Sequence, residues 1–157
     1  MKLGLALSVS LSLSGHVQPQ APPPPSWSTG LHGVVYFAPG RAHRLPPPAI
    51  DPIGQLAPTI PDSAYVVVAG KTDTQGDAAS NLALSLRRAR SVADELVARG
   101  VDSRQITLLA CGERDLNRPT PDDTPELLNR SAYFDWRSTP WPQSLNCEQH
   151  PYSEASD

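Results

Sequence analysis

The sequence predicts an α/β fold in which helices pack against a sheet as a two-layer sandwich. Two observations support this prediction. Short β-branched runs alternate with helical patterns between residues 32 and 136, and one apolar run, AYVVVAG, has the length and composition of a strand buried on both faces. The order strand, helix, strand also requires at least one crossover connection. A chain of 157 residues has room for one such domain and some additional sequence.

Four segments predict strands because they are short, rich in β-branched or aromatic residues, and bounded by turn formers. The first lies before a proline-rich stretch, and the second is the apolar run quoted above. The four strand segments are 32–38, 64–70, 103–111 and 131–136.

One long helix and two weaker ones are expected between these strands. The long helix begins at Asp77 or Ser80, either of which can cap it, and ends at Arg99, before Gly100. Its apolar residues recur at spacings of three and four, which gives one buried stripe. The weaker helical patterns lie at 49–56, which is interrupted by proline, and at 124–130.

The two ends of the chain differ from this central part. Residues 1–14 combine one lysine, a short apolar stretch and small residues, which predicts a bacterial signal peptide cleaved after Ser14. The stretch is too short and too rich in serine to predict a membrane span, and an uncleaved anchor is the alternative. Residues 15–31 predict an extended proline-rich linker. Residues 138–157 show no periodicity and are expected to form an irregular tail.

Charge and cysteine content narrow the functional classes. A formal net charge of −3 without a basic stripe argues against binding to nucleic acid. The two cysteines, Cys111 and Cys147, form an even number, which fits a disulfide in an oxidising compartment; two unrelated thiols are the alternative. No cysteine or histidine spacing predicts a metal site, so no cofactor is expected.

The candidate site lies in the stretch GKTDTQGDAASNLALSLRRA, which joins the second strand to the long helix. Thr72, Asp73 and Gly76 are typical turn formers, so ordinary turn chemistry is the simplest interpretation. However, helical geometry places Asn81 and Arg88 on one flank of the apolar stripe, close to the strand end that carries Asp73. An aspartate can hold an ammonium group while an arginine binds a carboxylate with two prongs. The arrangement therefore suits a zwitterionic ligand.

These residues resemble the peptidoglycan-associating domain named after outer membrane protein A, which also occurs in peptidoglycan-associated lipoproteins and flagellar stator proteins. The resemblance covers about residues 33–136, and the combination of motifs is specific although each motif alone is weak. It implies an OmpA-like domain at 32–137 with β-α-β-α-β-β order, a four-stranded mixed sheet and one long helix. The matching residues are Gly70, Thr72, Asp73, Gly76, Asn81, Leu84-Ser85, Arg88-Ala89, Gly100-Val101, Gly112-Glu113 and Asn129-Arg130.

The resemblance also implies a function and a place in the cell. It implies a non-catalytic domain, exported to the periplasm of a Gram-negative bacterium and associated with the outer membrane or the cell wall. Its expected partner is peptidoglycan, held through the diaminopimelate of the stem peptide. In that family the two residues that hold diaminopimelate correspond here to Asp73 and Arg88. The other expected ligand-binding residues are Thr72, Gly76, Asn81 and Arg130.

Three departures from the family pattern leave a second function open. Lys71 replaces the usual histidine and is expected to place a competing cation beside Asp73. Ser131 replaces the second arginine of an Asn-Arg-Arg motif, and the first helix is interrupted by proline. The alternative is therefore a structural component of an envelope secretion or pilus complex, with partner proteins and weak or no binding of peptidoglycan. Catalysis is not expected, since no histidine with an orienting group stands near Cys111 or a serine.

Overall fold

The computed structural model describes residues 32–42, 45, 47–141 and 146–152, with the backbone alone at 47–51. The expected signal peptide, its cleavage site and the proline-rich linker lie outside the described residues. Within the described part, no helix combines the length and the apolarity that a membrane crossing requires.

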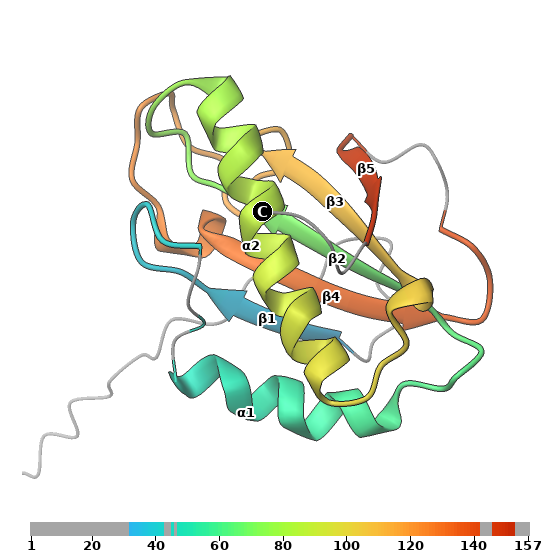
Figure 1. The fold of residues 1–157 in the computed structure, drawn as a ribbon. Helices are drawn as coiled ribbons and strands as arrows, with labels where there is room; N and C mark the ends of the chain where they lie inside the picture. The colour runs from blue at the N-terminus through green and yellow to red at the C-terminus, as the bar shows by residue number, and fades with distance from the viewer. Residues whose placement is uncertain (1–31, 43–44, 46, 142–145, 153–157) are drawn as a thin grey trace, which may run out of the picture.

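A five-stranded mixed sheet forms the centre of the molecule (Figure 1). The neighbouring strands β2 and β3 are parallel, whereas every other pair of neighbours is antiparallel. The parallel pair is joined by the long helix, because parallel neighbours need a crossover connection. In spatial order the strands are β1 (His32–Tyr36), β4 (Ser131–Arg137), β2 (Tyr65–Lys71), β3 (Ile106–Gly112) and β5 (Glu148–Pro151).

Two helices lie on one side of this sheet. The long helix α2 (Ala78–Ala98) crosses the face of the sheet, and the shorter helix α1 (Pro47–Leu56) lies along its β1 side (Figure 1). Asp77 caps α2 by accepting a hydrogen bond from the Ser80 amide at 2.9 Å. In the part of the chain that the structure describes, three short 3-10 helices complete the fold: η1 (Ala57–Thr59), η2 (Ser103–Gln105) and η3 (Leu127–Asn129).

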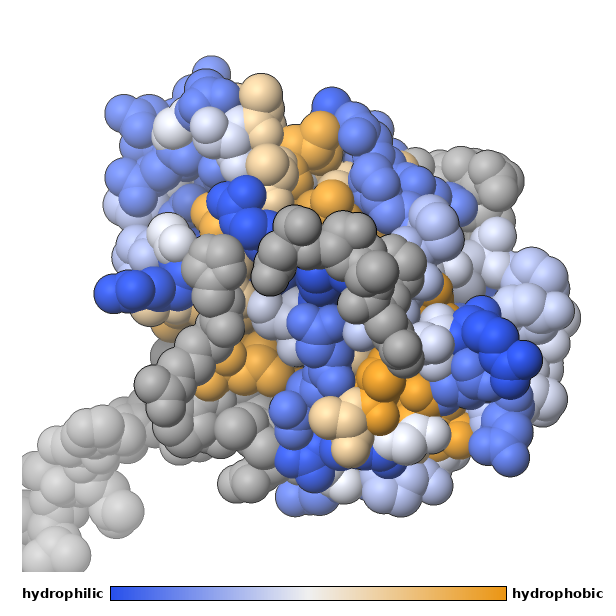
Figure 2. Space-filling model, in the orientation of Figure 1, coloured by the Kyte–Doolittle hydropathy of each residue, from blue (hydrophilic) through white to orange (hydrophobic). Residues whose placement is uncertain are grey.

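The apolar stripe of α2 forms the main core with the sheet. The outward face of α2 is hydrophilic, and apolar side chains gather along its flanks, where it meets neighbouring elements (Figure 2). A second, smaller core lies on the opposite face of the sheet, where Trp141 packs on β2 and β3. The main core includes Val35, Phe37, Ile53, Val66, Val68, Ala89, Val92, Leu96, Leu108 and Phe134.

Most predicted elements are confirmed, and one part of the fold prediction was wrong. The α/β sandwich with one long helix is present, and the helix expected at 124–130 is the short turn η3. The sheet has five strands where four were predicted, because residues 148–151 of the expected irregular tail form β5 against β3. This strand has no local signal in the sequence, since its pairing depends on the free edge of β3 and on a distant cysteine.

Candidate functional site

The candidate site lies at the carboxyl end of β2, where helix α2 comes very close to the strand. A Cβ atom at Gly70 would lie 1.8 Å from the carbonyl oxygen of Ser85, so only glycine permits this approach. Ser85 Oγ in turn accepts a hydrogen bond from the Gly112 amide at 2.9 Å, which ties the helix to the end of β3. This packing brings the next turn of α2, which carries Arg88, against the β2 end.

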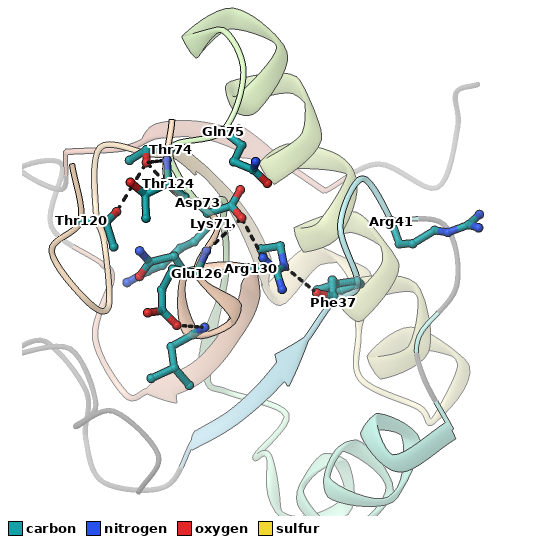
Figure 3. A network of polar contacts seen from close by, with 12 residues as sticks. Phe37, Arg41, Lys71, Asp73, Thr74, Gln75, Thr120, Thr124, Glu126 and Arg130 are labelled. Carbon is teal, nitrogen blue, oxygen red and sulfur yellow. Dashed lines mark hydrogen bonds and ion pairs between the residues drawn. The ribbon is translucent and has the colours of Figure 1, made fainter. Parts of the chain in front are cut away.

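Asp73 is nearly buried, with 7% of its surface exposed, and uses one carboxylate oxygen for two contacts. Its Oδ2 atom lies 2.8 Å from Arg130 Nη1 and accepts a longer hydrogen bond, 3.3 Å, from the Glu126 amide. The guanidinium of Arg130 also donates to the Phe37 carbonyl at 3.3 Å, as Figure 3 shows. Among the described residues, no hydrogen bond reaches Asp73 Oδ1, which leaves one carboxylate oxygen for another cation.

Arg88 is completely buried, and its charge has no carboxylate partner at ion-pair distance among the described residues. Its Nη1 atom donates to the Lys71 carbonyl at 2.7 Å, and its Nε atom donates to the Arg41 carbonyl at 3.0 Å. The guanidinium lies 5.2 Å from the centre of the Phe37 ring, within the range of a cation–π contact. The remaining nitrogen, Nη2, is buried and has no hydrogen-bond partner.

Burial changes the proton affinity of this guanidinium. Desolvation lowers the pKa of Arg88 to about 10, because a low-dielectric surrounding disfavours the charged form. The negative charge of Asp73 acts in the opposite direction, and the positive charges of Arg130 and Arg87 lower the pKa further. Arg88 therefore remains a cation at neutral pH, in a place where an anion would be stabilised strongly.

The other predicted residues have different positions. Thr72 is fully buried, and its Oγ1 atom has no partner, so it is a second unsatisfied group beside Asp73. Asn81 holds the turn itself: its Nδ2 atom donates to the Gln75 carbonyl at 3.0 Å and to Glu113 Oε2 at 2.6 Å. Gly76 is exposed and supplies the positive φ of 88° that the turn before α2 requires.

The expectation that Lys71 competes for Asp73 was wrong. Its Nζ atom lies 2.8 Å from Asp115 Oδ2 and donates to Asn117 Oδ1 at 2.9 Å, and the side chain is 2% exposed. In a regular strand Lys71 and Asp73, two positions apart, would point to the same face. The pairing shifts between Gly70 and Lys71, however, and β2 ends at Lys71, so the alternation does not continue to Asp73. The cation at Asp73 is instead Arg130.

Several groups of the site were not predicted from the sequence. Three are backbone atoms, namely the carbonyls of Lys71 and Arg41 and the amide of Glu126, which no sequence motif marks. The aromatic ring beneath Arg88 comes from Phe37, which the sequence places in the first strand without any sign of a role in the site. These groups converge from three segments of the chain, so only the folded structure brings them together.

The predicted disulfide between Cys111 and Cys147 is confirmed. Their Cα atoms are 4.3 Å apart, and the bond joins the end of β3 to the segment just before β5. Trp141 lies on the same face, where it contacts the small second core and donates from its indole nitrogen to the Tyr65 carbonyl at 2.9 Å. The disulfide thus attaches the C-terminal segment to the sheet beside the candidate site.

The fold and the site define an OmpA-like domain, and the chain belongs to the OmpA family, whose model matches residues 36–130. Outer membrane protein A of Yersinia pseudotuberculosis is 37% identical to the chain over 108 residues, a match that covers 67% of the chain and 30% of that protein. The chain therefore spans less than a third of the length of this curated relative.

Two solved structures share the fold. The peptidoglycan-associated lipoprotein of Burkholderia pseudomallei superimposes with a TM-score of 0.61 at 23% identity, covering 67% of this chain and 90% of that one. The OmpA-like domain of FopA1 from Francisella tularensis superimposes with a TM-score of 0.57 at 23% identity, covering 80% of this chain and 75% of that one.

The charges at the site are unequal in a way that bears on its chemistry. The Asp73 carboxylate forms its ion pair with Arg130, whereas its negative charge acts on Arg88 only from beyond ion-pair distance. Arg88 thus lacks a carboxylate of its own, and its Nη2 donor is unused. A ligand carboxylate would pair with the charge of Arg88 and accept a hydrogen bond from its Nη2 atom, while a ligand ammonium would bind Asp73 Oδ1.

Proposed function

We propose that this domain is a non-catalytic module of the cell envelope that binds peptidoglycan through the diaminopimelate of its stem peptide. The observation that carries the proposal is the buried guanidinium of Arg88, which has an orphaned Nη2 donor and no carboxylate at ion-pair distance among the described residues. A buried donor without a partner costs about 1–3 kcal/mol, so a site that retains one gains affinity for a ligand that supplies the acceptor.

The ligand chemistry follows from the two charges. The side-chain end of diaminopimelate carries both an ammonium and a carboxylate on one carbon atom. The carboxylate fits Arg88, with Thr72 Oγ1 as an additional unsatisfied donor, and the ammonium fits the free oxygen of Asp73. A ligand with only one of these charges would satisfy half of the site.

Arg130 gives the site a defined resting state. Its ion pair with Asp73 partly neutralises the carboxylate before the ligand arrives. In the bound state, the ligand ammonium shares Asp73 with Arg130, and the ligand carboxylate offsets the extra positive charge that results. This balance explains why the site carries two arginines and one aspartate.

Two features of the matched proteins favour this proposal. The family model spans the segment from Tyr36 to Arg130, which contains all six predicted ligand-binding residues. A structural neighbour is itself described as a peptidoglycan-associated lipoprotein. From these likenesses and from the expected signal peptide, we infer that the domain works in the periplasm, next to the outer membrane or the cell wall.

Co-sedimentation with purified sacculi tests the proposal. Asp73→Ala and Arg88→Ala should each weaken binding by about 2–5 kcal/mol, the usual cost of truncating one side of a desolvated charge pair. Arg88→Lys should also bind poorly, since a point charge cannot reproduce the two-pronged contact. Arg87→Ala is the matched control because Arg87 is exposed on the neighbouring position of the same helix.

Equal sedimentation of wild type, Asp73→Ala and Arg88→Ala would refute the proposal. In that case the alternative function, a structural component of an envelope secretion or pilus complex, would be favoured. Competition with free diaminopimelate separates recognition of the stem peptide from nonspecific adhesion to the sacculus, because only the former is displaced.

A further inference from the structure

Lys71 occupies an unusual place for a lysine, because it is almost completely buried directly before the binding turn. Its ammonium contacts Asp115 at 2.8 Å and Asn117 at 2.9 Å, both in the loop of residues 113–126 that follows β3. Burying an ammonium is expensive unless it is paired and hydrogen-bonded, so these two contacts are a condition of the folded state. Lys71 thereby fastens this loop to the end of β2.

Asn117 extends the connection to the far side of the loop. Its Nδ2 atom donates to the Leu128 carbonyl at 2.6 Å and to Ser131 Oγ at 3.0 Å. The buried Asn129 adds two hydrogen bonds of 2.8 Å to the same loop: its Oδ1 atom accepts from the Arg118 amide, and its Nδ2 atom donates to the Arg118 carbonyl. The loop is therefore joined to η3 and to the beginning of β4.

The segment fixed in this way carries the groups that contact Asp73. The Glu126 amide precedes η3, and Arg130 follows it directly. Both lie within two residues of the positions that Asn117 holds, Leu128 and Ser131. Figure 3 shows Glu126, Arg130 and Lys71 around Asp73, with the Arg130 guanidinium pointing at the carboxylate. A shift of this turn would move Arg130 away from Asp73.

We propose that Lys71 is a positioning residue of the ligand-binding site. It acts through Asn117 and the η3 turn, which set the place of Arg130 at Asp73, and it does not touch the ligand. The inference rests on the proposed function, because it describes how the same site obtains its geometry.

The proposal also links two departures from the family pattern. Lys71 stands in place of a histidine, and Ser131 stands in place of an arginine. In the structure, both contact the same side chain, that of Asn117. The two replacements thus form one connected unit, in which the ammonium is neutralised by Asp115 and so does not compete for Asp73.

A double-mutant cycle tests the inference with a soluble stem peptide that contains diaminopimelate, measured by titration calorimetry well below the unfolding temperature. Lys71→Met should weaken binding by about five- to a hundredfold, the range for residues coupled through one network. In the Arg130→Ala background, the same change should have no further effect. Additive losses, or full affinity of Lys71→Met, would overturn the proposal. Arg104→Met is the control, since it removes an ion-paired cation at the other end of β3.

A second measurement separates this inference from the proposed function, because it needs no ligand. The side-chain Nε–H signal of Arg130 in the NMR spectrum of the free protein should shift in Lys71→Met and stay in place in Arg104→Met. If wild type binds no peptide, the proposed function fails, and this signal alone decides the role of Lys71. If Lys71→Met does not fold, Asn117→Ala, which removes the same link at a half-buried position, should give the same shift. An unchanged signal would contradict the proposal.

Discussion

At the scale of single residues, Gly70 controls the distance between α2 and the strand ends that carry the site. A Cβ atom there would meet the carbonyl oxygen of Ser85 at 1.8 Å and the amide nitrogen of Ala89 at 3.1 Å, and both are backbone atoms. Such a clash cannot be relieved by rotating a side chain, so the helix itself would have to move. Arg88 would then lose its 2.7 Å hydrogen bond to the Lys71 carbonyl.

Gly70→Ala is therefore expected to lower the free energy of unfolding by about 3 kcal/mol, the upper end of the usual range for overpacking. The same change should weaken binding of the stem peptide, because it displaces Arg88. Gly100→Ala is the control: Gly100 has a positive φ of 95° with no atom within 4 Å of an added Cβ. That change should cost about 1 kcal/mol through its backbone conformation and leave binding intact. Urea denaturation measures the free energy of unfolding of both variants, and equal losses in Gly70→Ala and Gly100→Ala would contradict the close-packing argument.

At the scale of elements, the start of α2 depends on the charge state of its cap. Hydrogen bonds from Ser80 lower the pKa of Asp77 below its ordinary value of 3.8, since they favour the ionised carboxylate. A group whose pKa is depressed on folding adds stability above its unfolded pKa and loses it as the pH falls through the folded value. The cap of α2 thus weakens in acid.

Asp77→Asn should separate this titration from the capping itself. Asparagine caps a helix about as well as aspartate and has no acidic proton, so the helix start is retained. The wild type should be the more stable protein at neutral pH, and its advantage should shrink as the pH falls below 3.8. Thermal unfolding of both proteins between neutral and acidic pH tests the claim, and an advantage that does not change with pH would contradict it.

The elements themselves were largely predictable from local patterns. The apolar run predicted as 64–70 is β2 at Tyr65–Lys71, and the helix predicted from Asp77 to Arg99 is α2 at Ala78–Ala98. Side-chain periodicity and caps act over a few residues, so the sequence alone contains them. By contrast, β5 has no periodicity of its own and becomes a strand only because the free edge of β3 accepts it.

The site was predictable only in part for the same reason. Asp73 and Arg88 stand 15 positions apart, on a strand end and a helix whose geometry is regular, so their convergence followed from the pattern. Arg130 lies 57 positions from Asp73, and Asn117 lies 46 positions from Lys71. The positions of Arg130 and Asn117 depend on the loop of residues 113–126, whose sequence has no periodicity. The direction in which Lys71 points was therefore not accessible from the sequence.

At the scale of the whole molecule, the two faces of the sheet are covered in different ways. Both helices lie on one face, where they form the main core. On the other face, Trp141 packs on a small set of β2 and β3 side chains, and the disulfide joins Cys147 to Cys111 of β3. Since β5 follows Cys147 directly, the covalent bond holds the start of this strand close to β3, beside which it lies in the sheet (Figure 1).

Removing the disulfide should therefore loosen β5 and the small core together. The bond closes a loop with a sequence separation of 36, so Cys147→Ala should lower the free energy of unfolding by about 4 kcal/mol on the chain-entropy model. A reductant should destabilise the wild type by a similar amount and leave Cys147→Ala unchanged, which is the internal control. Amide hydrogen exchange should accelerate first in β5 and then at the β3 edge, because β3 loses its outer partner. If exchange rises evenly over the sheet instead, the disulfide stabilises the domain as one unit and does not act as a local fastening of its C-terminal strand.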